Sequence, residues 1–525
     1  MGIYLNPDNE NFKEIVNAKI YVDKSMMIET LEHIVRNGNK YICISRPRRF
    51  GKTVAGNMLA AFYSKGCDST DLFCNLKISE TEIYAKKRNR CNVIQIDMNS
   101  EYQNAKDKSE LINRITEKIK SELRIEFPVV DIQDEDSLAD SILKIYTSDK
   151  TQTFIIILDE YDVLVREQVD KELFGKYLSF LNGLFKSNTV KPAIAMAYLT
   201  GILPIVRDKI QSKLNNFREY TIIKAGALAE YIGFTSEEVR CLCEQYDMDY
   251  EECKRWYDGY SLQGMELYNP ESVICSIDEG EYGSYWGQTS SYEVISDRIR
   301  ENFVGTRDAV IRMMAGESVG VNVTRYLNTM DSFGTTDDVL TYLIHLGYLA
   351  YDREHKKCRI PNREVRQEWE NALLSDKNYE TTNRIIAESE ELLHETWKGN
   401  EDAVAKALDE SYIHVTSNRS YNNEDALQSA IYLAYLYALN QYNVFREMTT
   451  GKGFADVVYV PVTPDLPAMI IELKHNGTVE SAIDQIRTKK YYDSLEHYKG
   501  DLLFVGINYD EKEKTHSCKI ERFVK

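Results

Sequence analysis

The stretch ISRPRRFGKT (residues 44–53) decides the fold of this chain. It follows the apolar run Tyr41–Ser45, which predicts a strand, and it precedes a helical stretch, the context that a phosphate-binding P-loop requires. Backbone N–H groups at the start of that helix would hold the phosphates. Lys52 would reach the β- and γ-phosphates, and the hydroxyl of Thr53 would bind Mg²⁺. Arg46 stands where the usual pattern has its first glycine, which leaves the conformation of the loop open.

A second motif follows the apolar strand predicted at Phe154–Leu158. This strand ends in Asp159 and Glu160, as a Walker B strand does. Asp159 would contact Mg²⁺, and Glu160 would polarise the attacking water. Taken separately, the two motifs have a simpler interpretation: a buried strand with a solvated acidic end, and an unrelated basic turn. Because they occur in the right order and context, we predict that the chain binds a nucleotide.

A third predicted strand, Ala193–Leu199, is followed by Thr200, and further strands are predicted at Asn92–Asp97 and Tyr220–Lys224. The Thr200 hydroxyl could sense the γ-phosphate or simply end its strand, and the spacing does not decide between the two. The residues expected to bind ATP are Arg46, Pro47, Arg48, Arg49, Phe50, Gly51, Lys52, Thr53, Asp159 and Thr200. The candidates for a charge-stabilising arginine are Arg46, Arg48, Arg49, Arg207 and Arg218, and the sequence does not choose among them.

The order of the predicted elements indicates three domains. Strand-like runs alternate with amphipathic helices over residues 1–233, which predicts an α/β domain with a largely parallel sheet. Helices dominate residues 234–374, and a capping box is predicted where they begin. From Asp337 onward a helix, a short β-hairpin and another helix suggest a winged-helix module, or else a plain helical bundle with one hairpin. After the polar stretch 375–383, residues 384–525 form a third unit of helices and strands.

Six segments, read together, identify a family. They are YVDKS (21–25), SRPRRFGKT (45–53), LDEYD (158–162), YLTGILPI (198–205), WYDGY (256–260) and LYNPESV (267–273). With these segments in this order, the chain resembles the bacterial AAA-ATPase-like family whose members carry a C-terminal PD-(D/E)XK nuclease-like domain. The resemblance covers nearly the whole length. It implies that Arg46 in place of the first P-loop glycine is a feature of the family.

Two acidic residues of the last domain lie on predicted strands. Asp456 follows a glycine-containing turn, and Glu472 alternates with Lys474 onto one face of a strand. Asp456 and Glu472 can face one another on antiparallel strands, where the carbonyl after Glu472 would complete an oxygen-rich site for Mg²⁺ or Mn²⁺. The metal would activate a bound water while Lys474 orients it. The alternative is a solvent-facing ladder of salt bridges on a sheet.

The D…E-x-K pattern and the αβββαβ order around it are those of the PD-(D/E)XK nucleases, so we predict a restriction-endonuclease-like α/β domain. Asp456 and Glu472 are the expected metal ligands, and together with Lys474 they are the expected catalytic residues of this site. Glu424 on the preceding helix and Gln485 on the following one match accessory positions of that fold.

The composition excludes several classes of protein. A net charge of −19 over 525 residues argues against a protein that coats nucleic acid through bulk charge. Basic residues outnumber acidic ones over 353–366, in the proposed wing, which leaves room for local contacts with nucleic acid. The ten cysteines are scattered, no apolar run could span a bilayer, and the N-terminus lacks the features of a signal peptide. We therefore expect a cytoplasmic protein with no membrane partner.

The leading hypothesis is an ATP-binding and ATP-hydrolysing protein coupled to a metal-dependent nuclease domain that cleaves nucleic-acid phosphodiesters. ATP and Mg²⁺ are the expected cofactors, with Mn²⁺ compatible at the nuclease site. DNA or RNA is the expected partner, and a homo-oligomer is compatible with this layout. One alternative is a nucleotide-switched regulator that binds nucleic acid or protein through a non-catalytic nuclease-like domain. Another is that the ATPase half hydrolyses ATP slowly and acts as a switch.

Overall fold

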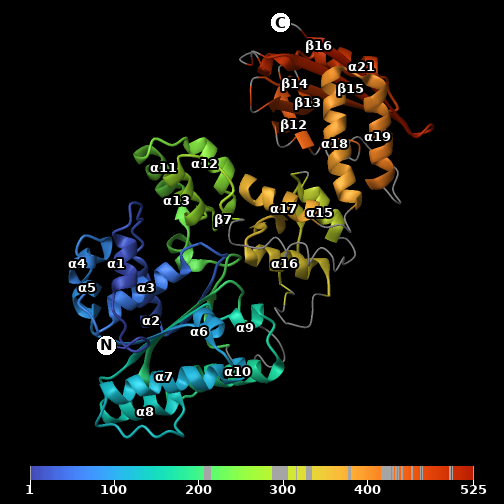
Figure 1. Ribbon diagram of the computed structural model, residues 1–525. Coiled ribbons are helices and arrows are strands. Elements are labelled where there is room, and N and C mark those ends of the chain that lie inside the picture. Colours follow the sequence, from blue (N-terminus) through green and yellow to red (C-terminus); the bar gives the residue numbers. More distant parts are fainter. Residues whose placement is uncertain are drawn as a thin grey trace. The chain divides into compact units, whose positions relative to one another are not determined.

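A computed structural model of the chain contains two compact units, which are described separately (Figure 1). The first comprises Met1–Ser291, Arg298–Thr306 and Ser318–Glu368, and the second comprises Tyr292–Asp297, Arg307–Glu317 and Trp369–Lys525. The structure describes residues 2–205, 215–286, 306–314, 316–324, 326, 334–375, 380–415, 427, 431, 434, 435, 437, 438, 441–450, 453–461, 463, 465–495, 498 and 500–523.

A five-stranded sheet forms the centre of the first unit. Its strand order is β2-β3-β4-β1-β5, and every neighbouring pair is parallel. The strands are β1 (Tyr41–Ser45), β2 (Asn92–Asp97), β3 (Phe154–Asp159), β4 (Ile194–Gly201) and β5 (Arg218–Tyr220). The predicted α/β fold with a largely parallel sheet is confirmed. The strand predicted at 220–224 is wrong in position, because Thr221 and Lys224 bond to each other through their backbones in a turn.

Helices cover both faces of this sheet (Figure 1). Ile156 and Leu158 of β3 pack into the same core as residues of helices α7, α8 and α10. The intervening Ile157 faces helix α3, 3.6 Å from the position that a Cβ on Gly56 would take. Strands that are buried on both faces are apolar throughout, which explains the continuous apolar run of β3.

The helices that pack around the sheet are mostly short. The α-helices are α1 (Glu10–Val16), α2 (Met27–Arg36), α3 (Lys52–Tyr63), α4 (Thr70–Phe73), α5 (Glu82–Lys87), α6 (Met98–Asn104), α7 (Leu111–Glu126), α8 (Leu138–Ser148), α9 (Val163–Arg166) and α10 (Lys171–Phe185). The 3₁₀ turns are η1 (Lys77–Glu80), η2 (Lys108–Glu110), η3 (Lys191–Ala193) and η5 (Gly226–Tyr231).

The carboxyl ends of β1, β3 and β4 meet at one edge, because these strands are consecutive neighbours in the sheet. The loop 46–51 follows β1, Asp159 is the last residue of β3, and Thr200 is the penultimate residue of β4. Open α/β sheets bind their ligands at this edge. The topology therefore gathers the P-loop and the acidic strand end, which are far apart in the sequence.

A short antiparallel sheet and three helices follow in the first unit. The strands β6 (Phe234–Thr235), β7 (Tyr260–Leu262) and β8 (Met265–Tyr268) pair in the order β6-β8-β7. The helices are α11 (Ser236–Gln245), α12 (Tyr250–Tyr257) and α13 (Pro270–Glu279). The predicted capping box is confirmed, since the side chains of Thr235 and Glu238 each accept a bond from the other's backbone N–H. These three strands were not predicted, because each has only two to four residues.

The predicted order of helix, hairpin and helix is also present. It consists of α16 (Thr336–Leu346), β10 (Ala350–Asp352), β11 (Lys357–Arg359) and α17 (Arg363–Ser375). A two-residue strand, β9 (Val319–Gly320), pairs with β11 as a third strand. Helix α15 (Thr306–Met314) precedes these elements in the chain. The assignment of this segment to a winged helix stays a prediction.

The second unit contains a five-stranded mixed sheet in the order β12-β13-β14-β15-β16. Only β14 and β15 are parallel, and helix α21 connects them. The strands are β12 (Tyr442–Thr450), β13 (Gly453–Pro461), β14 (Ala468–His475), β15 (Leu502–Asp510) and β16 (Thr515–Phe523). The helices are α18 (Glu380–Lys398), α19 (Glu401–Val415), α21 (Val479–Thr488) and the 3₁₀ turn η8 (Tyr491–Leu495). The predicted order of β12 to β15 with the helix between β14 and β15 is confirmed, and β16 is an additional edge strand. The predicted helix that carries Glu424 lies mostly outside the described residues.

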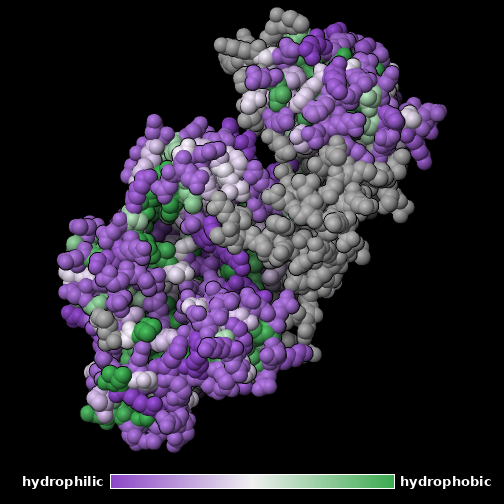
Figure 2. Space-filling model, viewed as in Figure 1, coloured by the Kyte–Doolittle hydropathy of each residue, from purple (hydrophilic) through white to green (hydrophobic). Residues whose placement is uncertain are grey.

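The described surface is mainly hydrophilic on the face that Figure 2 shows, with scattered hydrophobic residues. This agrees with the acidic composition. Within the described ranges, no helix combines the length and the apolar character that crossing a membrane demands.

Candidate functional site

The loop between β1 and α3 has an unusual backbone. Arg49 and Gly51 have φ angles of +66° and +87°, so the chain enters the left-handed region twice within three residues. Glycine adopts this conformation without steric cost, whereas Arg49 is one of the uncommon non-glycine residues that do so. Helix α3 begins directly afterwards at Lys52. The N–H groups of its first turn have no acceptor within the helix and can bind an anion.

Asp159 connects the P-loop helix with two strands of the sheet. The Thr53 hydroxyl donates a hydrogen bond of 2.6 Å to one of its carboxylate oxygens. The Thr200 hydroxyl donates to the other oxygen. The carboxylate is 5% exposed. Thr53 and Asp159 therefore lie where one cation could contact both, and Thr200 contacts the acid instead of projecting alone from the strand end.

Lys52 is buried beneath the loop. Its ammonium donates a 2.8 Å hydrogen bond to the carbonyl of Pro47. Burial lowers the pKa of Lys52, and the nearby carboxylates of Glu160 and Asp159 oppose that effect. The ammonium of Lys52 has three N–H donors, so it can donate to a phosphate oxygen in addition to the carbonyl of Pro47.

Two acidic residues in the turn after β3, Glu160 and Asp162, lie near Arg166 at the end of helix α9. The Arg166 guanidinium forms an ion pair with Glu160 and lies 3.3 Å from a carboxylate oxygen of Asp162. Burial raises the pKa of Glu160, an effect that Lys52 opposes. Glu160 has a φ angle of +51°, so its backbone is also in the left-handed region. The ion pair with Arg166 thus fixes the side chain of the predicted water-polarising residue.

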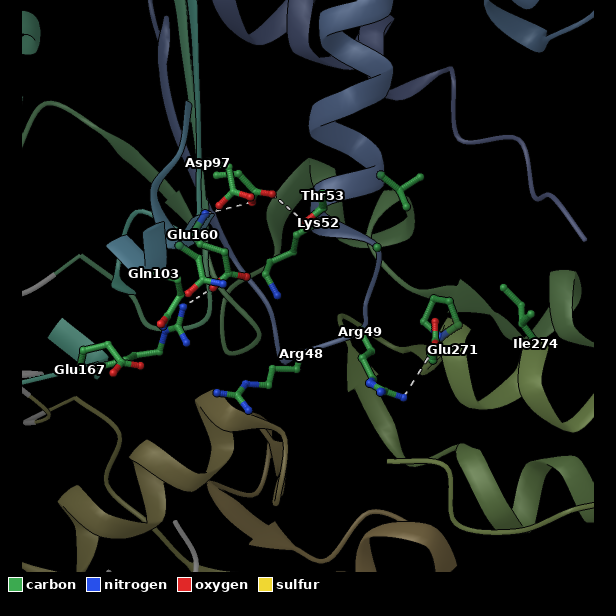
Figure 3. A pocket seen from close by; sticks show the side chains of 16 residues that line it. Arg48, Arg49, Lys52, Thr53, Asp97, Gln103, Glu160, Glu167, Glu271 and Ile274 are labelled. Carbon is green, nitrogen blue, oxygen red and sulfur yellow. Dashed lines mark hydrogen bonds and ion pairs between the residues drawn. The ribbon is translucent and has the colours of Figure 1, made fainter. Parts of the chain in front are cut away.

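The side chains of Lys52, Asp159, Glu160 and Arg166 line a pocket of about 670 Å³ (Figure 3). Figure 3 shows Lys52, Thr53, Asp97 and Glu160 around one space, with Arg48 and Arg49 on the loop beside it. Helix α13 contributes a further wall. The lining residues are Arg48, Arg49, Gly51, Lys52, Thr53, Val54, Asp97, Asn99, Gln103, Asp159, Glu160, Arg166, Glu167, Pro270, Glu271 and Ile274.

Four of the residues expected to bind ATP are not among those that line this pocket: Arg46, Pro47, Phe50 and Thr200. The guanidinium of Arg46 is fully buried and donates to the carbonyls of Ser45 and Tyr220, at 2.9 and 3.0 Å. Two of its nitrogens have no hydrogen-bond partner in the described part of the chain. Burial lowers the pKa of Arg46 to about 10. In this conformation Arg46 holds the ends of β1 and β5 together and does not face the pocket.

The other arginine candidates differ in position. Arg48 and Arg49 line the pocket. Arg49 also donates to the carbonyl of Tyr285 at 3.2 Å and lies 3.8 Å from Glu271. Arg218 lies over the ring of Tyr220, and residue 207 lies outside the described residues.

A smaller, mainly apolar pocket of about 110 Å³ adjoins the first and shares with it Gly51, Val54, Pro270 and Ile274. The N-terminal segment forms its outer wall. The hydroxyl of Tyr21, which lines the pocket, is buried and has no hydrogen-bond partner among the described residues. The full lining is Phe12, Ile15, Ile20, Tyr21, Val22, Lys24, Phe50, Gly51, Val54, Ala55, Met58, Tyr231, Gly233, Phe234, Pro270 and Ile274.

Asp97 and Arg166 are among the residues of the larger pocket that sequence reasoning missed. Asp97 ends β2 directly beside Asp159 in the parallel register. Burial, and to a smaller extent Asp159, raise the pKa of Asp97. A strand ending in an acid was a usable signal for Asp97, since β3 ends in the same way. Arg166 gave no such signal, because only the short helix α9 brings it back to Glu160.

The second unit brings the predicted D…E-x-K residues together. The antiparallel register of β13 and β14 pairs Val457 with Ile471, the residues next to Asp456 and Glu472. A carboxylate oxygen of Asp456 accepts a 2.8 Å bond from the backbone N–H of Leu473. The Lys474 ammonium donates to Glu472 at 3.0 Å and to the side-chain oxygen of Gln485 at 2.8 Å. Gln485, the accessory residue predicted on the following helix, therefore joins this group.

Glu472 is the most perturbed acid of this group. Its side chain is 1% exposed, and one of its two oxygens has no hydrogen-bond partner among the described residues. Burial, followed by the charge of Asp456, raises its pKa to about 7, although Lys474 opposes the rise. Such a carboxylate is not the solvent-facing ladder that was the alternative. Tyr491, which the sequence did not indicate, accepts a 3.1 Å bond from Gln485 through its hydroxyl.

The predicted accessory residue Glu424 lies outside the described residues. Among the described residues, no group of three or more His, Cys, Asp or Glu side chains is arranged to hold a metal. The described acids of this site are Asp456 and Glu472, so backbone carbonyls and water would supply the other ligands of a cation here.

In comparisons with known proteins, the residues of the two candidate sites fall mainly within matches to two different families. Residues 9–211 match the family described as "Predicted AAA-ATPase", and residues 422–518 match the PD-(D/E)XK nuclease superfamily. An uncharacterized protein from the vnfD 5′ region of Azotobacter chroococcum mcd 1 is 22% identical over 369 residues. That match covers 67% of this chain and 66% of the relative, slightly less than two thirds of the relative's own length.

Two solved structures resemble parts of the chain more distantly. A Walker-type ATPase of Pyrococcus abyssi is 14% identical, with coverage of 66% of this chain and 94% of that one and a TM-score of 0.33. The ORC2 protein of Aeropyrum pernix in its ADP form is 13% identical, with coverage of 70% and 97% and a TM-score of 0.29. The domain assignment rests on the family matches and the described topology. The matches therefore indicate an AAA-ATPase-like domain over residues 9–211 and a PD-(D/E)XK nuclease-like domain over residues 422–518.

Proposed function

We propose that this protein binds and hydrolyses ATP in its first unit and cleaves nucleic-acid phosphodiesters with a divalent metal in its second. The observation that supports the proposal most strongly is the isolated, buried oxygen of Glu472 beside Lys474 and Asp456. Burying a carboxylate with an unpartnered oxygen costs free energy unless a ligand compensates for it. A divalent cation is the ligand that this set of groups suits.

In the first unit, the pocket suits a nucleoside triphosphate. The first turn of α3, Lys52, Arg48 and Arg49 would bind the phosphates, since they supply N–H donors and positive charge on one side of the pocket. Thr53 and Asp159 would hold Mg²⁺, and their 2.6 Å contact is consistent with a shared cation. When bound, Mg²⁺ would neutralise charge that develops on the phosphates.

The neighbouring apolar pocket suits the base of that nucleotide. It adjoins the phosphate pocket through four shared residues, and the apolar surfaces of the N-terminal segment and helix α13 enclose it. A purine ring would be desolvated there. The unpartnered hydroxyl of Tyr21 could bond to a ring nitrogen.

Glu160 is the proposed general base for hydrolysis. Its carboxylate would accept a proton from water while the water oxygen forms a bond to the γ-phosphorus. The bond to the bridging oxygen breaks, and ADP leaves with that electron pair. Thr200 would hold Asp159 in place through its hydrogen bond.

In the second unit, Asp456, Glu472 and the carbonyl of Leu473 would hold Mg²⁺ or Mn²⁺. Bound metal supplies an activated water and stabilises charge on the phosphate. Lys474 would orient that water, because its ammonium already bonds to Glu472. Gln485 positions Lys474 from the other side through its 2.8 Å bond.

We further propose three functional domains, 1–233, 234–374 and 384–525. The middle one would contact nucleic acid through the β10–β11 hairpin. Arg353, Lys356 and Lys357 on this hairpin are exposed. Exposed cations bind phosphates in a salt-dependent manner.

The test measures phosphate release and the cleavage of plasmid DNA and of RNA, using the full chain with Mg²⁺ or Mn²⁺, with and without ATP. We expect Glu160→Gln to lower ATP turnover at least 100-fold and Glu472→Ala or Lys474→Ala to abolish cleavage. Glu480→Gln serves as the control, because Glu480 is an exposed acid of the same unit. If the wild-type chain cleaves neither DNA nor RNA under any of these conditions, the nuclease proposal is wrong.

A second candidate is a nucleotide-switched regulator whose nuclease-like domain only binds. The observation in its favour is the ion pair between Lys474 and Glu472, which compensates part of the buried charge without a metal. Calorimetry of the full chain with MnCl₂ separates the candidates. If Glu472→Gln leaves the heat of Mn²⁺ binding unchanged, the second candidate is favoured.

A further inference from the structure

Arg166 lies on the wall of the larger pocket and pairs with two acids of different exposure. Its side chain is 12% exposed, and it pairs with Glu160 and Asp162 at once. Burial alone would lower the pKa of Arg166, but the charges of Asp162 and Glu160 raise it. The guanidinium is therefore positively charged and is shared between two carboxylates.

Asp162 is the fixed partner of this arginine. It is 1% exposed, and one of its oxygens accepts bonds from the backbone N–H groups of Ile202 and Leu203, at 3.0 and 2.8 Å. The segment that directly follows β4 thus holds Asp162 in place. Glu160, by contrast, is 21% exposed and faces the pocket, so it is the partner that can be exchanged.

The ion pair has a consequence for the proposed reaction. The Arg166 guanidinium occupies a carboxylate oxygen of Glu160, a residue that lines the pocket. Glu160 must accept a proton from water if it is the general base. While Arg166 is bound to it, that oxygen of Glu160 is engaged by the guanidinium instead of by a water molecule.

The geometry points to Arg166 as an arginine that exchanges Glu160 for a γ-phosphate oxygen when ATP is bound, which releases Glu160 to act on water. This inference rests on the proposed function of the first unit. The planar guanidinium has donors on separate edges in a fixed geometry, so it can bond to Asp162 on one edge and to a phosphate on another. The γ-phosphate is the relevant group, because the general base must lie next to the phosphorus that water attacks.

The inference predicts a difference between ATP and ADP. ADP has no γ-phosphate, so Arg166 would remain on Glu160 when ADP is bound. Arg166 would therefore contribute to the affinity for ATP and to turnover, and contribute little to the affinity for ADP.

The experiment is calorimetry on the full chain with Mg²⁺, using ADP and a non-hydrolysable ATP analogue. We expect Arg166→Met to weaken binding of the analogue at least tenfold and to change ADP binding by less than twofold. Turnover of ATP should fall at least 100-fold, as with other arginines that bind the transferred phosphoryl group. Arg218→Met is the matched control, because Arg218 does not line the pocket, and it should leave the ratio of the two affinities unchanged.

A double-mutant cycle tests the exchange itself. Glu160→Gln removes the charge that competes for Arg166, so it should tighten binding of the analogue at least threefold. The same substitution in the Arg166→Met background should leave that affinity unchanged. If Glu160→Gln tightens binding of the analogue equally in both backgrounds, the exchange does not occur. The same holds if Arg166→Met weakens the binding of ADP and of the analogue by the same factor.

The result for the wild type separates the two proposals. If the wild-type chain binds neither nucleotide, the proposed function of the first unit fails and this inference fails with it. Retained ADP binding by Arg166→Met shows that the variant is folded. If Arg166→Met binds no ADP, the experiment uses Arg166→Lys in its place. We expect Arg166→Lys to keep its affinity for ADP and to bind the analogue at least threefold more weakly. An unchanged ratio in Arg166→Lys would overturn the inference.

Discussion

The substitution Glu472→Gln tests whether the second unit holds a carboxylate that needs a cation. Glu472 is 1% exposed, and one of its oxygens has no hydrogen-bond partner among the described residues. The other oxygen accepts a bond from Lys474 at 3.0 Å. Burial and the charge of Asp456 raise the pKa of Glu472 from 4.5 to about 7.

The size and sign of the effect follow from this pKa. A rise of about 2.5 units corresponds to about 3 kcal/mol, at about 1.4 kcal/mol per unit. Because the folded-state pKa is the higher one, protonated Glu472 stabilises the fold fully below about pH 4.5. That contribution is lost as the pH rises to about 7. Glutamine cannot ionise, so the variant keeps the stability of the protonated form at every pH.

The assay is urea unfolding of the full chain in EDTA at pH 5 and pH 8. Hydrogen exchange of peptides from β14 reports specifically on the second unit. We expect the free energy of unfolding of the variant to be higher than that of the wild type by up to about 3 kcal/mol at pH 8, and by much less at pH 5. Added Mn²⁺ should stabilise the wild type and leave the variant unchanged.

The control is Glu480→Gln, which makes the same chemical change at a side chain that is 63% exposed. It should shift stability little at either pH. If Glu472→Gln changes stability by the same amount at pH 5 and pH 8, the carboxylate is not perturbed by burial. The argument for a cation at this position would then be wrong.

Three further outcomes follow from the structure. Gly201→Ala should lower the free energy of unfolding of the first unit and the affinity for ATP, because a Cβ there would lie 2.6 Å from an oxygen of Asp162. Urea unfolding measures the first quantity and calorimetry the second, and if neither changes, the described packing around Gly201 is wrong. Arg46→Met should leave ADP affinity within about twofold, since its guanidinium bonds to backbone inside the sheet, and a tenfold loss would place it on the phosphates instead. The double substitution Lys356→Ala and Lys357→Ala should weaken binding of duplex DNA. In a titration at several salt concentrations, the slope of log K against log salt should fall by the equivalent of roughly two phosphate contacts. An unchanged slope would exclude contact through the hairpin.

Much of the first site was predictable because its signals are local. The P-loop and the acidic strand end each occupy a short continuous stretch, and parallel strands bring their carboxyl ends to one edge. Lys52, Thr53 and Asp159 lie together for this reason. The strand predicted at 220–224 was misplaced because Thr221 and Lys224 form two backbone hydrogen bonds with each other in a turn. This turn ends the strand at Tyr220, and no composition rule detects it.

The remaining site residues depend on contacts that the sequence does not encode locally. Arg46 was expected among the phosphates, yet the carbonyl of Tyr220, far along the chain, holds it in the interior. Arg166 was not considered at all, because its role follows from the direction in which the short helix α9 returns it to Glu160. Side-chain direction is set by packing, and packing is a property of the whole unit.

The two sites share a physical feature that links structure to function. Each has a carboxylate whose pKa burial raises, Glu160 in the first unit and Glu472 in the second, with a cationic side chain as its partner. Such pairs contribute little stability, because the cost of burying both charges offsets their attraction. They are useful when a ligand changes the balance: a phosphate can attract the cation away, and a metal can replace the proton. Under the proposed function, the ion pairs with Arg166 and Lys474 are the ligand-free arrangements of the two sites, and the two substitutions Arg166→Met and Glu472→Gln test this interpretation independently.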